Sequence, residues 1–180
     1  MVAIQAVLAT VRNIELKARI VDCDAVRKQA EAIATERLGI ERQVDTYFHC
    51  RNGRLKLREI EGQAAQLIWY TRPDAHGPKP SDYQIVPVNA PGRLKVALTA
   101  ALGMRVVVEK RREIFLWHNV RIHLDEVAGQ GTFLEFEAVL QPPLDDTSGQ
   151  AQLEELARHF GIATDDLVSG SYGEMLDTKG

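Results

Sequence analysis

Residues 13–20 read Asn13-Ile14-Glu15-Leu16-Lys17-Ala18-Arg19-Ile20. Every odd position in this stretch is polar or charged, and every even position is apolar. Because successive side chains of a β-strand point to opposite faces, this alternation predicts a strand with one charged face and one apolar face. Other segments of the chain repeat this pattern of one charged and one apolar face, and this repetition determines the fold that we expect.

Six further segments have the character of strands. Arg54–Arg58 carries three bases on one face, and Phe133–Leu140 carries two glutamates on one face. Turn residues separate several of these segments, as in Arg51-Asn52-Gly53. We therefore expect strands at residues 54–58, 67–72, 85–88, 105–117, 120–127 and 133–140.

Helices are expected between the strands. The first begins at a polar residue and is followed by Gly39 as a candidate C-cap, and the second has Pro91 near its first turn and Gly103 after its end. The expected helices span residues 24–38, 91–102 and 150–160, with a last short one between 165 and 176. This order of elements is typical of a strand-dominated α+β fold and not of alternating βαβ units.

The charged faces favour one arrangement of the strands. A sheet that closes into an antiparallel β-barrel of about eight strands, with helices packed outside, turns all the charged faces inward. Burying unpaired charges costs several kcal/mol per ion, so such an interior needs a charged ligand. The candidate lining consists of the bases Lys17, Arg19, Lys56, Arg58, Lys110, Arg112 and Arg121 and the acids Glu15, Asp125, Glu135 and Glu137.

Both signs of charge on this lining predict a polyanion bridged to carboxylates by a divalent metal. Glu135 and Glu137 face the same way on one strand, with Cα atoms about 6.5–7 Å apart. Together with Glu15 they offer hard oxygen ligands of the kind that Mg²⁺ or Mn²⁺ prefers. Taken alone, the pair is more often two surface glutamates on an edge strand.

Composition excludes several other classes of function. The net charge of −3, from 22 basic and 25 acidic residues, argues against a general nucleic-acid binder. No stretch approaches the ~20 apolar residues of a membrane span, and no GxGxxG or GxxxxGK[ST] motif is present. We expect a loosely attached leader at residues 1–10, a single domain over 11–180 and a cytoplasmic location.

Several short motifs resemble those of the CYTH domain, the superfamily of class IV adenylyl cyclases, thiamine triphosphatases and inorganic triphosphatases. Asn13–Lys17 resembles the ExExK signature that opens the domain, except that Asn13 stands where the first Glu is found. The resemblance covers residues 11–176, nearly the whole chain. The other matching segments are Gln43–Phe48, Gly53–Glu59, Tyr70–Asp74 with Lys79, Ser81 and Tyr83 after it, Val108–Arg112, Arg121–Val127, Phe133–Glu137 and Ser171–Leu176.

The resemblance implies a closed antiparallel β-tunnel that acts on triphosphates with Mg²⁺ or Mn²⁺. The expected metal ligands are Glu15, Glu135 and Glu137, with Asp125 nearby. We expect catalytic roles for Glu15, Lys17, Lys110, Arg112 and Asp125. The expected triphosphate ligands are Lys17, Arg19, Lys56, Arg58, Arg72, Lys79, Lys110, Arg112, Arg121 and His123.

Three functions remain open at this stage. The motifs are closest to the class IV adenylyl cyclases, which implies conversion of ATP to cyclic AMP and pyrophosphate. The second is a triphosphatase acting on tripolyphosphate, thiamine triphosphate or a nucleoside triphosphate. The third is a non-catalytic module that binds polyphosphate or a nucleotide, because Asn13 removes one negative charge from the metal site. The expected partner is a small-molecule triphosphate, and family members of this size can form homodimers.

Overall fold

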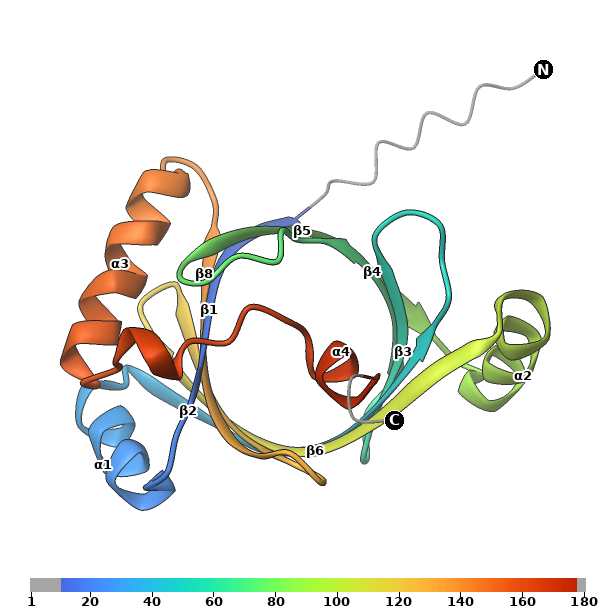
Figure 1. Ribbon diagram of the computed structural model, residues 1–180, viewed down its shortest axis with the longest axis horizontal. Helices are drawn as coiled ribbons and strands as arrows, with labels where there is room; N and C mark the ends of the chain where they lie inside the picture. Colours follow the sequence, from blue (N-terminus) through green and yellow to red (C-terminus); the bar gives the residue numbers. More distant parts are fainter. Residues whose placement is uncertain (1–10, 178–180) are drawn as a thin grey trace.

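Eight antiparallel strands form the wall of a closed barrel in the computed structural model, which describes residues 11–177 (Figure 1). The order around the wall is β1-β5-β4-β3-β2-β6-β7-β8. The expected α+β barrel is confirmed, while the expected leader at residues 1–10 lies outside the described residues. The strands are β1 Val11–Arg19, β2 Glu36–Phe48, β3 Arg54–Ile60, β4 Ala65–Thr71, β5 Lys79–Val88, β6 Met104–Trp117, β7 Val120–Val127 and β8 Gly131–Leu140.

The helices lie outside the barrel wall, apart from the short last one. Helices α1 (Cys23–Ile33) and α3 (Asp146–His159) lie on one side, and α2 (Pro91–Leu102) lies on the other (Figure 1). A 3₁₀ turn (Thr164–Asp166) leads towards α4 (Tyr172–Asp177), which lies across the barrel opening in this view. Within residues 11–177, no helix is long and apolar enough to cross a membrane.

The main hydrophobic core lies between the outer face of the barrel and the helices α1 and α3. Ile14 and Leu16 of β1 point outward and pack with Leu153 and Leu156 of α3. Phe115 of β6 belongs to the same cluster and is fully buried. The apolar faces predicted from the alternation therefore pack under the helices, and this leaves the charged faces to point into the barrel.

The expected helix over residues 24–38 is confirmed up to residue 33 and is wrong in its last five residues. Helix α1 ends at Ile33, and β2 begins at Glu36, where no strand was expected. Gly39 is not a C-cap: its φ of 101° accompanies the register shift between Arg37 and Gly39 in the β2–β6 ladder. Pairing of Glu36 and Arg37 with β6 outweighs the helical propensity of residues 36–38.

Strand β5 is longer than the segment 85–88 that we expected. It begins at Lys79, because residues 79–83 pair with β1 and residues 82–88 pair with β4. This pairing completes the barrel. It also brings Lys79 opposite Glu15 in the β1–β5 ladder.

Candidate active site

The inward faces of the strands surround a cavity of about 370 Å³ inside the barrel. Basic side chains from β1, β3, β6 and β7, and from Arg72 just after β4, meet there with carboxylates from β1, β2 and β8. The charged side chains on the cavity wall are Glu15, Lys17, Glu41, Lys56, Arg58, Arg72, Lys110, Arg112, Arg121, Glu135 and Glu137.

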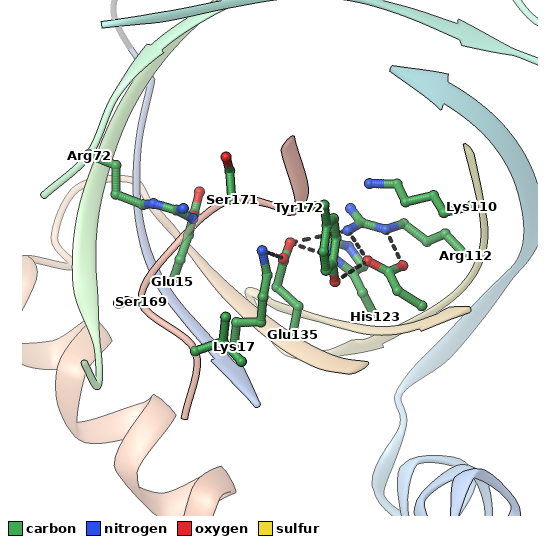
Figure 2. A network of polar contacts seen from close by, with 12 residues as sticks. Glu15, Lys17, Arg72, Lys110, Arg112, His123, Glu135, Ser169, Ser171 and Tyr172 are labelled. Carbon is green, nitrogen blue, oxygen red and sulfur yellow. Dashed lines mark hydrogen bonds and ion pairs between the residues drawn. The ribbon is translucent and has the colours of Figure 1, made fainter. Parts of the chain in front are cut away.

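One part of the wall is a buried network centred on Arg112 (Figure 2). The Arg112 Nε donates to Asp125 Oδ1 at 2.7 Å, and its Nη2 donates to Asp125 Oδ2 at 2.5 Å and to Glu135 Oε1 at 3.2 Å. The Lys17 Nζ lies 3.2 Å from Glu135 Oε2. Although burial alone would raise the pKa of Glu135, Lys17 and Arg112 hold it well below its usual value. Arg112 is thus fixed as a cation facing the cavity.

A second network gathers three bases around Asp45, which is 1 % exposed. Its carboxylate accepts from Lys56 Nζ at 3.0 Å and from Arg58 Nε at 2.7 Å, and Lys110 Nζ lies 3.6 Å away. Burial would raise the pKa of Asp45, but these three bases hold it well below its usual value. One carboxylate therefore supports three cations, all of which face the cavity.

Arg72 is the least satisfied base on the wall. Its side chain is 5 % exposed, and its Nη1 donates to Glu15 Oε2 at 2.6 Å. Its Nε and Nη2 are buried and have no hydrogen-bond partner in the part of the chain that the structure describes. A guanidinium has donors only, so the three N–H bonds on these two nitrogens require acceptors from a ligand or from water.

The carboxylates suit a divalent metal in their chemistry. Glu15 and Glu137 lie directly opposite each other in the β1–β8 ladder, and Glu135 is two residues away on β8. Each is now ion-paired: Glu15 with Arg72, Glu137 with Arg121, and Glu135 with Lys17. No group of three or more His, Cys, Asp or Glu side chains within residues 11–177 forms a ready metal cluster. The donor set fits Mg²⁺ or Mn²⁺ in type, and the metal assignment stays a prediction.

The first residue of α4 and the segment before it close one end of the cavity. The Tyr172 hydroxyl donates to Asp125 Oδ2 at 2.8 Å, and the Lys17 Nζ lies 3.8 Å from the centre of the Tyr172 ring. Figure 2 shows this ring between Glu135 and Lys110. Outside the cavity wall, Lys79 Nζ donates to the carbonyl oxygens of Val168, at 3.1 Å, and Ser169, at 3.0 Å.

Most of the predicted site residues meet on the cavity wall, and three do not. Arg19 is exposed and donates to the Gln130 carbonyl oxygen, Lys79 anchors the closing segment, and Asp125 is buried behind Arg112. The predicted residues that line the cavity are Glu15, Lys17, Lys56, Arg58, Arg72, Lys110, Arg112, Arg121, His123, Glu135 and Glu137.

Asn13, the departure from ExExK, is fully buried and lies outside the cavity lining. Its Oδ1 accepts a long hydrogen bond from the Tyr83 hydroxyl at 3.4 Å, and its Nδ2 is without a hydrogen-bond partner among residues 11–177. Asn13 therefore contributes no ligand to the cavity in this arrangement.

Sequence reasoning missed Asp45 and Gln43 as site residues, because no strand was expected over β2. The alternation of Gln43, Asp45 and Tyr47 with Val44 and Thr46 was the signal that could have found them. Tyr172 also lines the cavity and was not among the predicted site residues.

Comparison with known proteins gives the same architecture. The CYTH domain pattern matches residues 12–172. The PH1012 protein of Pyrococcus horikoshii OT3 superposes with a TM-score of 0.79 at 25 % identity, covering 90 % of this chain and 98 % of that chain. No curated protein sequence gives a significant match.

Two further structures carry names that mention an activity. A Vibrio parahaemolyticus protein described provisionally as an adenylate cyclase has a TM-score of 0.74 at 21 % identity, covering 91 % of this chain and 97 % of that chain. HpAC1 from Hippeastrum, a candidate adenylyl cyclase with a dominant triphosphatase activity, has a TM-score of 0.65 at 15 % identity, covering 94 % and 96 %. At these identities the likeness shows the fold alone.

Proposed function

The chain belongs to the CYTH domain family, and from this membership we propose that its tunnel binds a triphosphate and catalyses a metal-dependent reaction on it. The observation that carries the proposal is Arg72, whose buried Nε and Nη2 have no acceptor within residues 11–177. Arg72 lines a cavity whose wall also bears Lys17, Lys56, Arg58 and Lys110. A polyphosphate supplies many acceptor oxygens and balances the excess of bases over carboxylates on this wall.

The basic residues have distinct tasks in this proposal. Arg58, Arg72 and Arg112 offer planar donor pairs that match phosphate oxygens, while the lysines act as point charges. Asp45 and Asp125 hold Arg58 and Arg112 in place from behind, so these donors are oriented before the ligand arrives. Phosphoryl transfer depends mainly on such positioning and charge neutralisation.

Glu15, Glu135 and Glu137 would hold the divalent metal. When bound, the metal would polarise a phosphoryl oxygen of the substrate. Arg72 and Arg121 now neutralise Glu15 and Glu137. A triphosphate that draws these two arginines onto its own oxygens would leave both carboxylates free for metal ligation.

Our first candidate reaction is that of a class IV adenylyl cyclase. The ribose 3′-hydroxyl of ATP would attack the α-phosphorus, and pyrophosphate would leave as cyclic AMP forms. The motifs Gln43–Phe48 and Gly53–Glu59 support it, because they resemble that branch of the family.

A triphosphatase is the second candidate, and the openness of one tunnel end favours it. Leu38 and Ile85 line the cavity while remaining 52 % and 47 % exposed, so water enters from that end. Water would then attack the terminal phosphorus and release orthophosphate.

A product assay separates the two reactions. The purified protein is incubated with Mg²⁺ or Mn²⁺ and either ATP or tripolyphosphate, and the products are resolved by ion-exchange chromatography. Cyclic AMP with pyrophosphate identifies a cyclase, and orthophosphate released faster from tripolyphosphate identifies a triphosphatase. Binding of both ligands without turnover would leave a binding module and contradict the proposed catalysis.

The affinity for ATP is expected to fall as the pH rises from 7 to 9. Burial and the neighbouring Arg58 lower the pKa of Lys56 to about 8. Lys56 is therefore charged, and attracts phosphate, below this pH, and becomes neutral above it. One pH unit above the pKa, the loss should be on the order of tenfold. Calorimetric titrations at constant ionic strength would measure it.

Lys56→Arg is the matched control, because arginine stays charged throughout this range. The variant should show a flatter dependence of affinity on pH than the wild type. An affinity that does not change between pH 7 and 9 in the wild type would remove Lys56 from the phosphate site.

A further inference from the structure

The two ends of the tunnel differ in chemistry. Along β6 the inward side chains run from Val108 through Lys110 and Arg112 to Ile114. Val108 packs in one cluster with Tyr172 at the closed end, so Ile114 marks the open end. The other aliphatic side chains of the cavity wall are Leu38, Ile60, Ile68 and Ile85, and of these Ile68 packs in the cluster that contains Tyr172. A triphosphate has no apolar surface to place against them.

Gln43 lies where the basic region meets this aliphatic region. Its ladder partners are Lys110 on β6 and Ile60 on β3, and its side chain lines the cavity. It is only 3 % exposed. Its Nε2 donates to Glu41 Oε2 at 2.5 Å, while its Oε1 has no hydrogen-bond partner among the described residues.

The orientation of the Gln43 amide follows from Glu41. Turning the amide over would place its oxygen against a carboxylate oxygen, and two acceptors repel each other. The Nε2 therefore stays on Glu41, and the Oε1 is left as a buried acceptor on the cavity wall. A buried acceptor without a donor is costly, and a ligand that brings a donor removes this cost.

We propose that Gln43 is a specificity-determining residue, whose Oε1 accepts a hydrogen bond from the nucleoside of a nucleoside triphosphate. The donor is a sugar hydroxyl or a base amino group, and the aliphatic side chains pack against the flat base. This rests on the proposed function, since the triphosphate must lie on the neighbouring bases for the nucleoside to reach Gln43. Fully ionised tripolyphosphate has neither a donor nor an apolar surface.

The test compares two ligands in two variants. Binding of ATP and of tripolyphosphate is measured by calorimetry in EDTA, which suppresses metal-dependent turnover. Gln43→Leu should weaken ATP binding about fivefold to tenfold, the usual value of one hydrogen bond. It should leave tripolyphosphate binding within about twofold of the wild type.

Gln63→Leu is the matched control. Gln63 also lines the cavity and donates to Glu41, at 3.1 Å to Oε1, but it is exposed and has no buried orphan oxygen. Its loss should leave both affinities near those of the wild type. Equal losses in Gln63→Leu and Gln43→Leu would assign the effect to Glu41 and overturn the proposal.

Wild-type protein and ATP analogues identify the donor and do not depend on the folding of a variant. The analogues are 2′-deoxy-ATP, 3′-deoxy-ATP and purine riboside triphosphate, each lacking one donor. The analogue that lacks the donor to Gln43 should bind the wild type as weakly as ATP binds Gln43→Leu. Its affinity for Gln43→Leu should be no lower than its affinity for the wild type. If all three bind like ATP, the inference is wrong while the proposed function stands. If neither ATP nor tripolyphosphate binds the wild type, the proposed function itself fails.

Discussion

Replacing Glu137 with glutamine is expected to lower turnover of the preferred triphosphate about a hundredfold, or by about 2.7 kcal/mol in the activation barrier. Glu137 lies opposite Glu15 in the β1–β8 ladder and is the proposed metal ligand whose loss least disturbs the fold. Its ion-pair partner Arg121 is 41 % exposed, so water can solvate the freed guanidinium. Loss of a carboxylate ligand removes negative charge that holds the metal against the substrate.

The binding of ATP in EDTA should not weaken in Glu137→Gln, because the substitution removes a negative charge from a wall that binds an anion. This combination of a slower reaction and intact binding distinguishes a metal ligand from a structural residue. Glu126→Gln is the matched control: Glu126 pairs with Arg111 across two neighbouring strands, with half of its side chain exposed. Turnover of Glu137→Gln close to that of Glu126→Gln would exclude Glu137 as a metal ligand.

Asp45→Asn is expected to lower the free energy of unfolding by about 3–5 kcal/mol at pH 7. The substitution leaves Lys56, Arg58 and Lys110 facing one another without their counter-charge. Urea unfolding followed by fluorescence would measure the change, and the Tm should fall by about 10 °C for a chain of this size. Tripolyphosphate should restore more stability to the variant than to the wild type, because it replaces the lost negative charge.

Glu59→Gln provides the comparison for Asp45→Asn. Glu59 pairs with Lys95 at the surface, and exposed pairs of this kind contribute about 0–1 kcal/mol. A loss below about 1 kcal/mol in Asp45→Asn would show that the three bases do not depend on Asp45.

The contribution of Asp45 to stability also has a defined pH dependence. Because its pKa in the folded protein lies below that in the unfolded chain, its stabilising effect is complete above the unfolded value and is lost as the pH falls through the folded one. Asp45→Asn should therefore lose less stability on acidification than the wild type does. An equal loss on acidification in both proteins would contradict this assignment.

The sequence predicted the part of the fold that local alternation encodes. The period of two around Glu15 and Lys17, and again around Glu135 and Glu137, identified strands whose charged faces point into the barrel. Closure of the barrel followed from the cost of burying those charges without a ligand. Both inferences need only the direction of side chains along one strand.

Features that depend on the register between distant strands could not be predicted from the sequence. Glu15 and Arg72 are 57 residues apart, and their ion pair requires both the β1–β5 and the β5–β4 ladders to be known. Asp45 was missed because no strand was expected over β2. Residues 36–38 favour a helix locally, and only the pairing of Glu36 and Arg37 with β6 makes this stretch part of β2. Arg19 was placed in the site by its odd position, but it lies at the end of β1, where the side chain leaves the tunnel.

Titration of the wild-type protein with tripolyphosphate in EDTA, followed by calorimetry, tests most directly whether the tunnel binds a triphosphate. Orthophosphate and sulfate at the same ionic strength serve as the comparison, since they carry similar groups but cannot span Arg72, Lys56 and Lys110 together. We expect saturable binding of tripolyphosphate at one site per chain, at least a hundredfold tighter than that of either small anion. Binding no tighter than that of sulfate would contradict the proposal that the tunnel holds a triphosphate.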